Sequence, residues 1–542
     1  MLEKHFLHIV ETYKHHPLFS SSALLGAILF YYLVAVPFFL SPLRKIPGPY
    51  WNRVSKWPSL NGQRTNEWIG KVNSLHHKYG DVVVLSPSEI SVNGSPDMIN
   101  DIYVKNFSKG CFYENFRNHG NRVNPFSELN NECHLKYKKI LMTMYLKTAI
   151  FSTLNPTRKH LVKIAGKLVK RVRTDMSASK ANNEGAVEVF SLFSCLAMDV
   201  ILAFELGPSC GTDLIENLEE REIVKLYRVR DSVAFWTTFF PRIFRFIATN
   251  DVKNAFKKIE SWHFSLYSKA EEKSESPSIR ALNGKGFFGK DAYSFITDNI
   301  FAGHRTTATQ LTYFCYELSR PVNNVWHRRL KEELYGHFGV PKSEDSVIDD
   351  LEAIDKLIVL DALLQENLRV HSSIPGAEPR VVDRSYEVEI PDCDTMKRIL
   401  VPKGTVISCL PFSMHRQESV FPSPGKFSPE RWLKSQNESE EEFKSRVSGQ
   451  QRFMMPFGKG IRLCLGKNLA LIEIKIALAN LYWHFSSMIS DQWCYVESRK
   501  PSDILMGLKN RGLNKTDEEK MVMVDSYTTH PLNGECWLSW LS

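Results

Sequence analysis

The stretch Phe457-Gly-Lys-Gly-Ile-Arg-Leu-Cys-Leu-Gly466 decides the fold of this 542-residue chain, because it sets one cysteine among three glycines. Glycine adopts backbone angles that other residues resist, so the loop can pass close to a flat and bulky group. Cys464 stands just before a helical pattern, and N–H groups at a helix start stabilise a thiolate. A thiolate held in this way can be the axial ligand of a haem iron. A lone cysteine is more often simply buried, so the interpretation depends on the whole pattern.

The loop resembles the cysteine-ligand signature of the cytochrome P450 family, and similar segments recur in the family's order from about residue 46 to residue 485. The resemblance implies a mainly α fold with a minor β lobe, the cytochrome P450 fold, and haem b as cofactor. It implies that Cys464 is the axial haem iron ligand and that Arg462 meets a haem propionate. The positions that match the signature are Phe457, Gly458, Gly460, Arg462, Cys464 and Gly466.

Composition describes an ordinary globular protein, with 43% hydrophobic and 24% charged residues. The net charge of +9 is compatible with an anionic membrane or an acidic partner. No zinc-finger or basic-zipper pattern supports binding to nucleic acid. The ten cysteines are scattered without a CxxC pair, which favours reduced thiols in a cytosol-facing protein.

The N-terminal region predicts a membrane anchor, because no charged residue or histidine occurs between His16 and Arg44. As a helix, residues 18–40 are long enough to cross the hydrocarbon core. A cleaved signal peptide is the rival interpretation, but the apolar run exceeds a typical h-region and no clean cleavage site follows. Basic residues after the span place the remainder in the cytoplasm, and the resemblance implies the endoplasmic reticulum. The predicted organisation is a tail (1–17), a transmembrane anchor (18–40), a proline-rich hinge (41–50) and a haem-thiolate catalytic domain (51–542).

The longest helical pattern runs from Asp291 to Arg320 and contains Ala302-Gly-His-Arg-Thr-Thr307. Ala302 and Thr306 are one turn apart, so one helix face is small and then bears a hydroxyl. In the family this stretch crosses the distal haem face, which implies that Ala302 and Gly303 border the cofactor and that Thr306 relays protons. The family usually has an acid where this chain has Arg305. Its charge can bind a substrate carboxylate, hold an ordered water, or pair with Asp298 or Glu317.

Two further groups of residues gain a role from the resemblance. His134 and Lys138 share one helix face, which alone is most often a solvated basic face. The family similarity implies that they contact the haem propionates, as does Arg380. Glu366 and Arg369 form an ordinary i, i+3 pair, and the resemblance adds Arg431 to make a structural Glu–Arg–Arg cluster.

Elsewhere, residue patterns predict secondary structure. Residues 82–85 and 89–92 predict a hairpin, and 157–206 and 213–230 predict helices. The aromatic segment 235–247 is either core or a surface at the membrane interface. Loops are expected at 271–290 and 434–446, an exposed insertion at 497–520, and a terminal hairpin of 521–524 with 535–540.

The predicted function is that of a monooxygenase that inserts one oxygen atom of O2 into a small, largely apolar organic substrate. No flavin or nicotinamide segment is visible, so the resemblance implies electrons from NADPH through NADPH–cytochrome P450 reductase. Four lysines are predicted to dock it: Lys136, Lys139, Lys459 and Lys467. The segments look most like fungal members of secondary metabolism, and a pulcherrimin-type cyclic dipeptide is one candidate substrate. The alternatives are a haem-thiolate isomerase, dehydratase or reductase that does not use O2, and a non-catalytic haem-binding protein.

Overall fold

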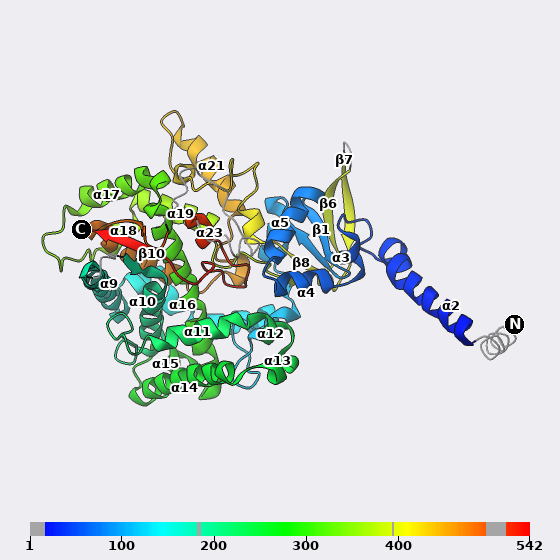
Figure 1. Cartoon of the computed structure of the whole chain (residues 1–542), viewed down its shortest axis with the longest axis horizontal. Helices are drawn as coiled ribbons and strands as arrows, with labels where there is room; N and C mark the ends of the chain where they lie inside the picture. Colours follow the sequence, from blue (N-terminus) through cyan, green and yellow to red (C-terminus); the bar gives the residue numbers. More distant parts are fainter. Residues whose placement is uncertain (1–16, 182–185, 393–394, 495–515) are drawn as a thin grey trace.

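The structure is a computed structural model, which describes residues 17–181, 186–392, 395–494 and 516–542. A large helical body carries a small β lobe on one side, and an N-terminal helix projects beyond that lobe (Figure 1). This arrangement confirms the predicted fold class. The described cysteines other than Cys494 are free thiols.

The β lobe is built on a five-stranded sheet with the order β1-β2-β8-β5-β3. Its first two strands are the predicted hairpin, paired antiparallel with Val83 opposite Ser91. Alternate apolar residues of the hairpin pack into a core of their own, which includes Val84 and Ile90. The strands are β1 (Val82–Ser86), β2 (Glu89–Val92), β3 (Ser108–Lys109), β5 (Arg380–Val381) and β8 (Val406–Ser408), with β6 (Tyr386–Asp392) and β7 (Thr395–Val401) as a separate hairpin.

Helix α16 (Lys290–Ser319) forms the axis of the helical body and ends just before Pro321, as its sequence predicts. It packs along α10 (Val189–Leu206), which is buried at every position except Ser191. The two helices approach closely at Gly303, where a Cβ atom would lie 2.8 Å from Ile201 Cγ1. Around this pair stand α9 (Pro156–Ala181), α17 (Asn324–Phe338), α19 (Ile358–Val370) and α22 (Lys467–His484).

Shorter elements complete the body and connect it to the lobe. Before α10 they are α3 (Tyr50–Val54), α4 (Trp57–Arg64), α5 (Trp68–Tyr79), α6 (Pro96–Ile99), η2 (Asn100–Val104), η3 (Cys111–Phe116), α7 (Asn131–Met142), η4 (Thr143–Tyr145) and α8 (Lys147–Phe151). After it come α11 (Glu222–Ser232), α12 (Ala234–Phe239), α13 (Pro241–Ile247), α14 (Asn250–Lys273), α15 (Pro277–Asn283), η5 (Pro321–Asn323), α18 (Leu351–Asp355), α20 (Pro411–Met414), η6 (Pro429–Trp432), α21 (Glu440–Phe453), η7 (Gly460–Arg462) and α23 (Asp517–Lys520).

Several predicted elements are wrong. The helix expected over 157–206 is interrupted by β4 (Ala186–Glu188), and the helix expected from 213 begins only at Glu222. The predicted loop 271–290 contains α15, whose start is capped by the Ser276 hydroxyl. The charged run 434–446 is helical from Glu440, because Ser439 and Glu442 form a capping box.

The predicted terminal hairpin is also wrong, because the last strand pairs elsewhere. Strand β10 (Trp537–Leu541) lies between β4 and β9 (Ser486–Ile489) and is antiparallel to both. Residues 521–524 contribute only one isolated bridge, between Met523 and Pro531. Most of the expected insertion 497–520 lies outside the described residues, and at its described end Asp517 is buried.

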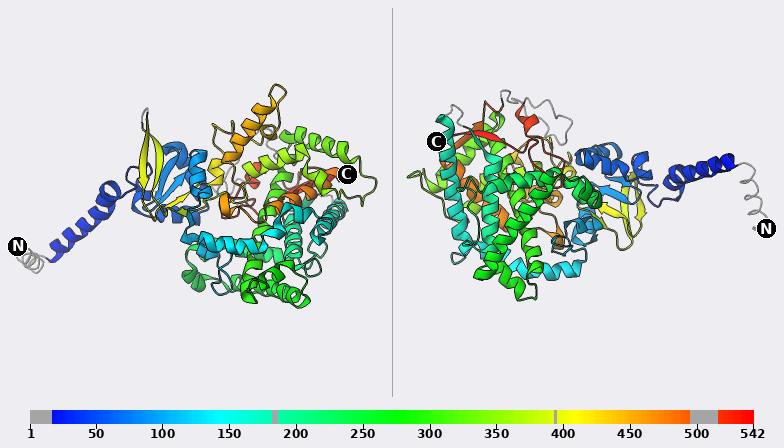
Figure 2. Two further views of the ribbon diagram at one scale, coloured as in Figure 1. Left: turned by 180° about the vertical axis from the view of Figure 1, so that it is seen from behind. Right: turned by 60° about the horizontal axis from the view of Figure 1, so that its bottom comes forward.

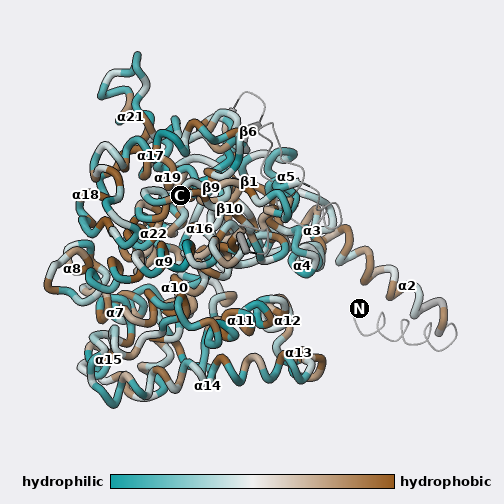
Figure 3. Tube along the Cα trace, turned by 60° about the vertical axis from the view of Figure 1, so that its left-hand side comes forward, coloured by the Kyte–Doolittle hydropathy of each residue, from teal (hydrophilic) through white to brown (hydrophobic). Residues whose placement is uncertain are grey.

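The N-terminal segment is helical from Pro17 to Leu40, as α2 (Pro17–Phe30) and a π-helical continuation η1 (Tyr31–Leu40). Within it Ser21–Leu40 is a candidate membrane span with a mean hydropathy of 2.3 and almost no burial. Helix α10 is also long and apolar enough, but it is a buried core helix. The N-terminal helix stands away from the body in every view and is hydrophobic along its length (Figures 2 and 3). The segment after it packs on the lobe, where Leu43 and Ile46 are buried.

The aromatic segment 235–247 lies on the surface. It forms α12 and α13, neither of which has a buried residue. Phe246 is 88% exposed, and Ile243 and Ile247 are about half exposed. The core interpretation of this segment is therefore excluded, and an exposed apolar surface flanked by Arg242 and Arg245 remains.

Candidate functional site

The cysteine loop is shaped by two glycines in the left-handed region, Gly458 (φ 69°) and Gly460 (φ 65°). At Gly460 a side chain is excluded by space as well, because a Cβ atom would lie 2.1 Å from the Tyr103 carbonyl oxygen. The turn closes where the Cys464 N–H donates to the Phe457 carbonyl over 2.8 Å. Gly466 has a φ of −81°, so no left-handed backbone explains the glycine there.

Cys464 lies at the start of α22, and the N–H groups of Gly466 and Lys467 are directed at its sulfur. Burial raises the pKa of the Cys464 thiol, while these N–H groups and the cations of Lys138 and Lys467 act in the opposite direction. The residue is nevertheless accessible, as is Leu463 beside it. A sulfur that is surrounded by protein and still accessible faces an internal space.

Two side chains of α7 hold the cysteine loop from outside. Lys138 Nζ donates to the carbonyl oxygens of Ile461 (2.9 Å) and Leu463 (2.5 Å). His134 Nε2 lies 3.3 Å from the same Ile461 oxygen, and its Nδ1 is 2.8 Å from the Pro125 oxygen. The structure thus brings both predicted propionate ligands to the loop, on one face of the helix as the i, i+4 spacing requires.

Three cations lie next to the loop, of which Lys109 and Arg380 are buried and Arg462 is partly buried. Arg462 donates to the carbonyl oxygens of Glu128 (2.6 Å) and Leu129 (2.9 Å). Arg380 donates to the Tyr113 hydroxyl over 3.1 Å, and its nearest carboxylate oxygen, of Glu378, is 3.7 Å away. Lys109, which the sequence analysis did not single out, is 6% exposed and donates to the Phe126 carbonyl over 2.5 Å.

These cations repel one another. Burial and then the charge of Arg380 lower the pKa of Arg462 to about 10. Burial and then the charges of Arg462 and Arg380 lower the pKa of Lys109. Across the described ranges, no carboxylate lies within ion-pair distance of Lys109, Lys138 or Arg462. A group with two carboxylates beside an accessible cysteine therefore fits this site, which matches the chemistry of haem and its two propionates.

The middle of α16 is the second part of the site. Most residues of this helix are buried, but Ala302 is exposed and Thr306 is partly exposed, so this face borders an internal space. The Thr306 hydroxyl donates to the Ala302 carbonyl one turn earlier, over 2.7 Å. Gly303 faces α10 at Ile201, so helix packing explains this glycine.

Arg305 points away from that space, toward α11. Its guanidinium lies 2.8 Å from the Asp231 carboxylate, and it also lies over the Phe190 ring. The predicted partners Asp298 and Glu317 are therefore wrong, since Glu317 is engaged by Arg320 and His371. Arg305 comes one residue before Thr306, so its side chain is turned by about 100° around the helix from the Thr306 hydroxyl.

The predicted structural cluster comes together at a fully buried carboxylate. Arg369 donates two hydrogen bonds to Glu366, at 2.7 and 2.9 Å, and Arg431 Nε lies 3.4 Å from the same group. The Trp432 indole N–H donates to Glu366 over 2.9 Å, a member that sequence reasoning missed. The guanidinium groups hold the pKa of Glu366 below its usual range.

The predicted docking lysines divide into two kinds. Lys136 and Lys139 are exposed on α7. Lys459 and Lys467 are only partly exposed, and Lys459 donates to the Arg452 carbonyl over 2.5 Å.

Comparison with known proteins decides the family. A family model described as "Cytochrome P450" matches residues 47–512. The chain belongs to the cytochrome P450 family. Its similar proteins are fungal enzymes named cytochrome P450 monooxygenases. They include hkm5 of Aspergillus hancockii (26% identical, covering 84% of this chain and 86% of that protein), FGM1 of Gibberella zeae (25%, 81% and 86%) and ABA2 of Pyricularia oryzae (27%, 82% and 85%).

The family assignment makes this protein a cytochrome P450 monooxygenase and implies haem as cofactor.

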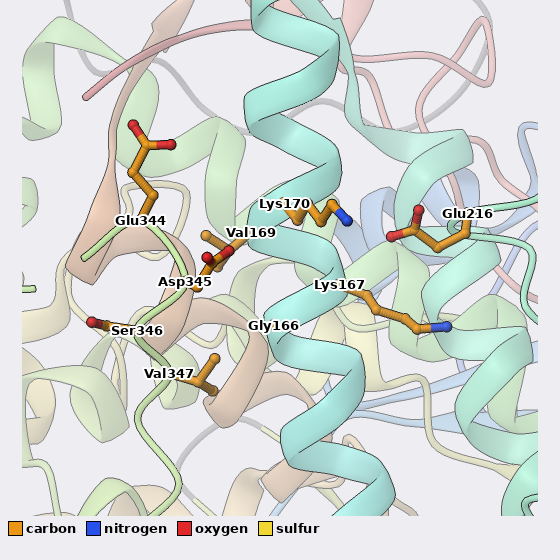
Figure 4. Close-up of a pocket in the computed structure, with 9 residues that line it drawn as sticks. All are labelled: Gly166, Lys167, Val169, Lys170, Glu216, Glu344, Asp345, Ser346 and Val347. Carbon is orange, nitrogen blue, oxygen red and sulfur yellow. The ribbon is translucent and has the colours of Figure 1, made fainter.

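A polar surface pocket between α9 and the segment before α18 contains none of the predicted site residues (Figure 4). Sequence reasoning missed two residues of the site itself, Lys109 and Asp298. Lys109 carries no motif, whereas Asp298 was weighed only as a partner of Arg305, although it is two turns from Thr306 on the same helix face.

Proposed function

We propose that this cytochrome P450 inserts one oxygen atom of O2 into a small, largely apolar organic molecule, with Cys464 as the axial iron ligand. The observation that carries the proposal is the cysteine loop, where two N–H groups are directed at an accessible sulfur. Beside it are the buried Lys109 and the partly buried Lys138 and Arg462, which have no carboxylate within ion-pair distance in the described part of the chain. Haem b bound there would activate O2, so that one oxygen atom enters a substrate C–H bond and the other leaves as water after two electrons and two protons are consumed.

The polypeptide then has four tasks. Arg462, Arg380, His134 and Lys138 bind the propionates, and we add Lys109 to this set. Phe457 and Gly458 border the proximal face, and Ala302 with Gly303 borders the distal face. Thr306 moves protons through its hydroxyl, which must turn from the Ala302 carbonyl to do so. Glu366, Arg369 and Arg431 keep the scaffold behind the ligand rigid.

Electrons come from NADPH through a separate reductase, and residues 18–40 anchor the enzyme in the endoplasmic reticulum membrane with residues 51–542 in the cytoplasm. The exposed lysines 136 and 139 support this docking surface better than the partly exposed 459 and 467. The exposed apolar residues of α13 supply a second contact with lipid. The fungal relatives support a place in secondary metabolism, and a pulcherrimin-type cyclic dipeptide remains our candidate substrate.

The function is tested by following three quantities in one preparation: NADPH oxidation, O2 consumption and product. The enzyme, a reductase and extracts of the source organism are incubated together, and metabolites are compared with and without the gene. The proposal is supported if product forms only when NADPH and O2 are both present, with one NADPH and one O2 consumed per molecule of product. Product under strict anaerobiosis without peroxide would assign the protein to the isomerases or dehydratases instead.

The membrane contacts are tested by removing residues 1–40. We expect the shortened protein to be extracted by alkaline carbonate yet still to bind vesicles, because α13 keeps its exposed apolar residues. Phe246→Asp in the shortened form should then abolish vesicle binding, whereas Phe288→Asp, at an exposed phenylalanine outside α13, should not. Resistance to carbonate extraction after truncation would contradict the single span.

A further inference from the structure

Asp298 is the carboxylate on the accessible face of α16. It is four residues before Ala302 and eight before Thr306, so the three share one helix face. Ile296, Thr297 and Ile300 around it are buried, whereas Asp298, Ala302 and Thr306 retain exposure. The Asp298 carboxylate thus borders the same internal space as the predicted proton relay.

The surroundings of Asp298 leave its charge uncompensated. In the described part of the chain, no cation lies within ion-pair distance of its carboxylate. The charge of Lys109 acts to lower the pKa of Asp298, but the Lys109 ammonium is held by the Phe126 carbonyl and lies 3.9 Å from the ring centres of Tyr113 and Phe126. The polar contact of Asp298 itself is with the Phe126 N–H.

Aromatic side chains from several parts of the chain form a cluster around Phe126, whose backbone N–H contacts Asp298. The Phe126 ring centre lies 5.0 Å from that of Phe116, and Tyr527 lies 4.9 Å from Phe116. Phe112 joins Tyr527 to Phe239 of α12, at 6.0 and 6.3 Å. These rings pack against one another, yet each keeps part of its surface exposed. The cluster therefore lines a space. A carboxylate beside the faces and edges of several aromatic rings is the environment that binds organic cations.

We propose that Asp298 anchors the substrate through a positively charged nitrogen enclosed by these aromatic rings, while the carbon to be oxidised lies one to two helical turns further along α16. The proposal rests on the proposed function of the site and favours an apolar substrate that carries one cationic nitrogen over a neutral cyclic dipeptide.

Distance favours an anchor over a proton donor. Ala302 and Thr306 lie about 6 and about 12 Å from Asp298 along the helix axis. A proton donor must be within hydrogen-bond reach of its acceptor, directly or through one water, and 12 Å exceeds that reach. A substrate with six to ten bonds between its nitrogen and the reactive carbon spans the same distance.

The test measures binding by equilibrium dialysis to the full-length, haem-loaded enzyme in lipid nanodiscs, with empty nanodiscs subtracted. The probes are N,N,N-trimethyl-4-phenylbutylammonium and its neutral carbon isostere, 5,5-dimethylhexylbenzene. The quaternary nitrogen neither titrates nor coordinates iron. We expect Asp298→Asn to weaken binding of the ammonium probe about tenfold or more and of the isostere by less than about twofold. Asp291→Asn, an exposed aspartate of the same helix, is the matched control and should change neither.

The pH profile of the wild type tests the same anchor without a variant. Burial raises the pKa of Asp298 to about 7, so binding of the ammonium probe should weaken as pH falls from 8 to 6. The other titratable groups that face Asp298 are Lys109, Glu205, Tyr145 and Tyr527. Any pH dependence of probe binding that these four groups cause should remain in Asp298→Asn. The Asn variant should therefore lose the step near pH 7, and Asp298→Glu should keep it.

Two results would overturn the proposal: equal losses for both probes in Asp298→Asn, or no preference of the wild type for the ammonium probe at pH 8. Either can occur while the reduced, CO-bound enzyme keeps its thiolate spectrum, so failure of the anchor is distinguishable from failure of the proposed function.

Discussion

The cysteine loop and the distal face of α16 are built from different kinds of contact. The loop closes within eight residues, through one hydrogen bond between Cys464 and Phe457 and two left-handed glycines. The distal face is one stripe of α16 joined by aromatic side chains from η3, α12 and the segment near Tyr527. Local backbone geometry therefore fixes the ligand, whereas long-range packing decides what lies opposite it.

The largest effect should come from Cys464→Ser, which removes the sulfur from the loop without changing its backbone. We expect complete loss of the thiolate signature in the spectrum of the reduced, CO-bound protein, because Cys464 is the sulfur at which the N–H groups of Gly466 and Lys467 are directed. Cys111→Ser, at the other exposed cysteine, should leave the spectrum unchanged. A thiolate spectrum that persists in Cys464→Ser would show that another residue is the ligand.

Next in size should be Gly460→Ala, which tests whether the loop depends on its backbone. The left-handed φ and the 2.1 Å approach to the Tyr103 oxygen leave no room for a methyl group. We expect a loss of at least about 3 kcal/mol in the free energy of unfolding, measured by urea denaturation, together with poor haem incorporation.

The control is Gly449→Ala in α21, where nothing lies within 4 Å of the added carbon. Alanine there should stabilise the helix by about 0.5–1 kcal/mol. If both variants behaved alike, close approach of the backbone would not be what shapes the cysteine loop.

On the distal face, Thr306→Ala should reduce coupled product formation about 100-fold and raise release of hydrogen peroxide, because proton delivery often contributes that much. The matched control is Thr312→Ala, whose hydroxyl makes the same bond to the carbonyl one turn earlier but is fully buried. Helix stability should change alike in both, so only the uncoupling separates them. Tightly coupled turnover in Thr306→Ala would remove this residue from the proton route.

The smallest effect should come from the Arg305–Asp231 ion pair, which joins α16 to α11. Because Asp231 is partly exposed, solvent screens the interaction, and a double-mutant cycle of Arg305→Gln and Asp231→Asn should give a coupling of about 1 kcal/mol or less. Product coupling should be unchanged, since the guanidinium points away from Thr306. A change in peroxide release with Arg305→Gln would instead connect this residue to proton delivery.

The elements that the sequence predicted well are those with a strong local cause. The hairpin of β1 and β2, helix α16 up to Pro321 and helix α22 after Cys464 all carry a clear pattern and a clear stop. The charged run that contains α21 was misjudged because its capping box, Ser439 with Glu442, was read as part of a charged surface. The prediction of a terminal hairpin was wrong because β10 pairs instead with β4, which is far away in the sequence.

Sequence alone determined the family and predicted the iron ligand and the helix that faces it, because each depends on a contiguous run of residues whose chemistry is local. Only the tertiary structure decided where Arg305 points, which cations gather without carboxylates, and that Asp298 borders the same space as Thr306. The physical reason is that burial and charge compensation are sums over neighbours. For Asp298 those neighbours, Lys109, Phe126 and Tyr527, come from three distant parts of the chain.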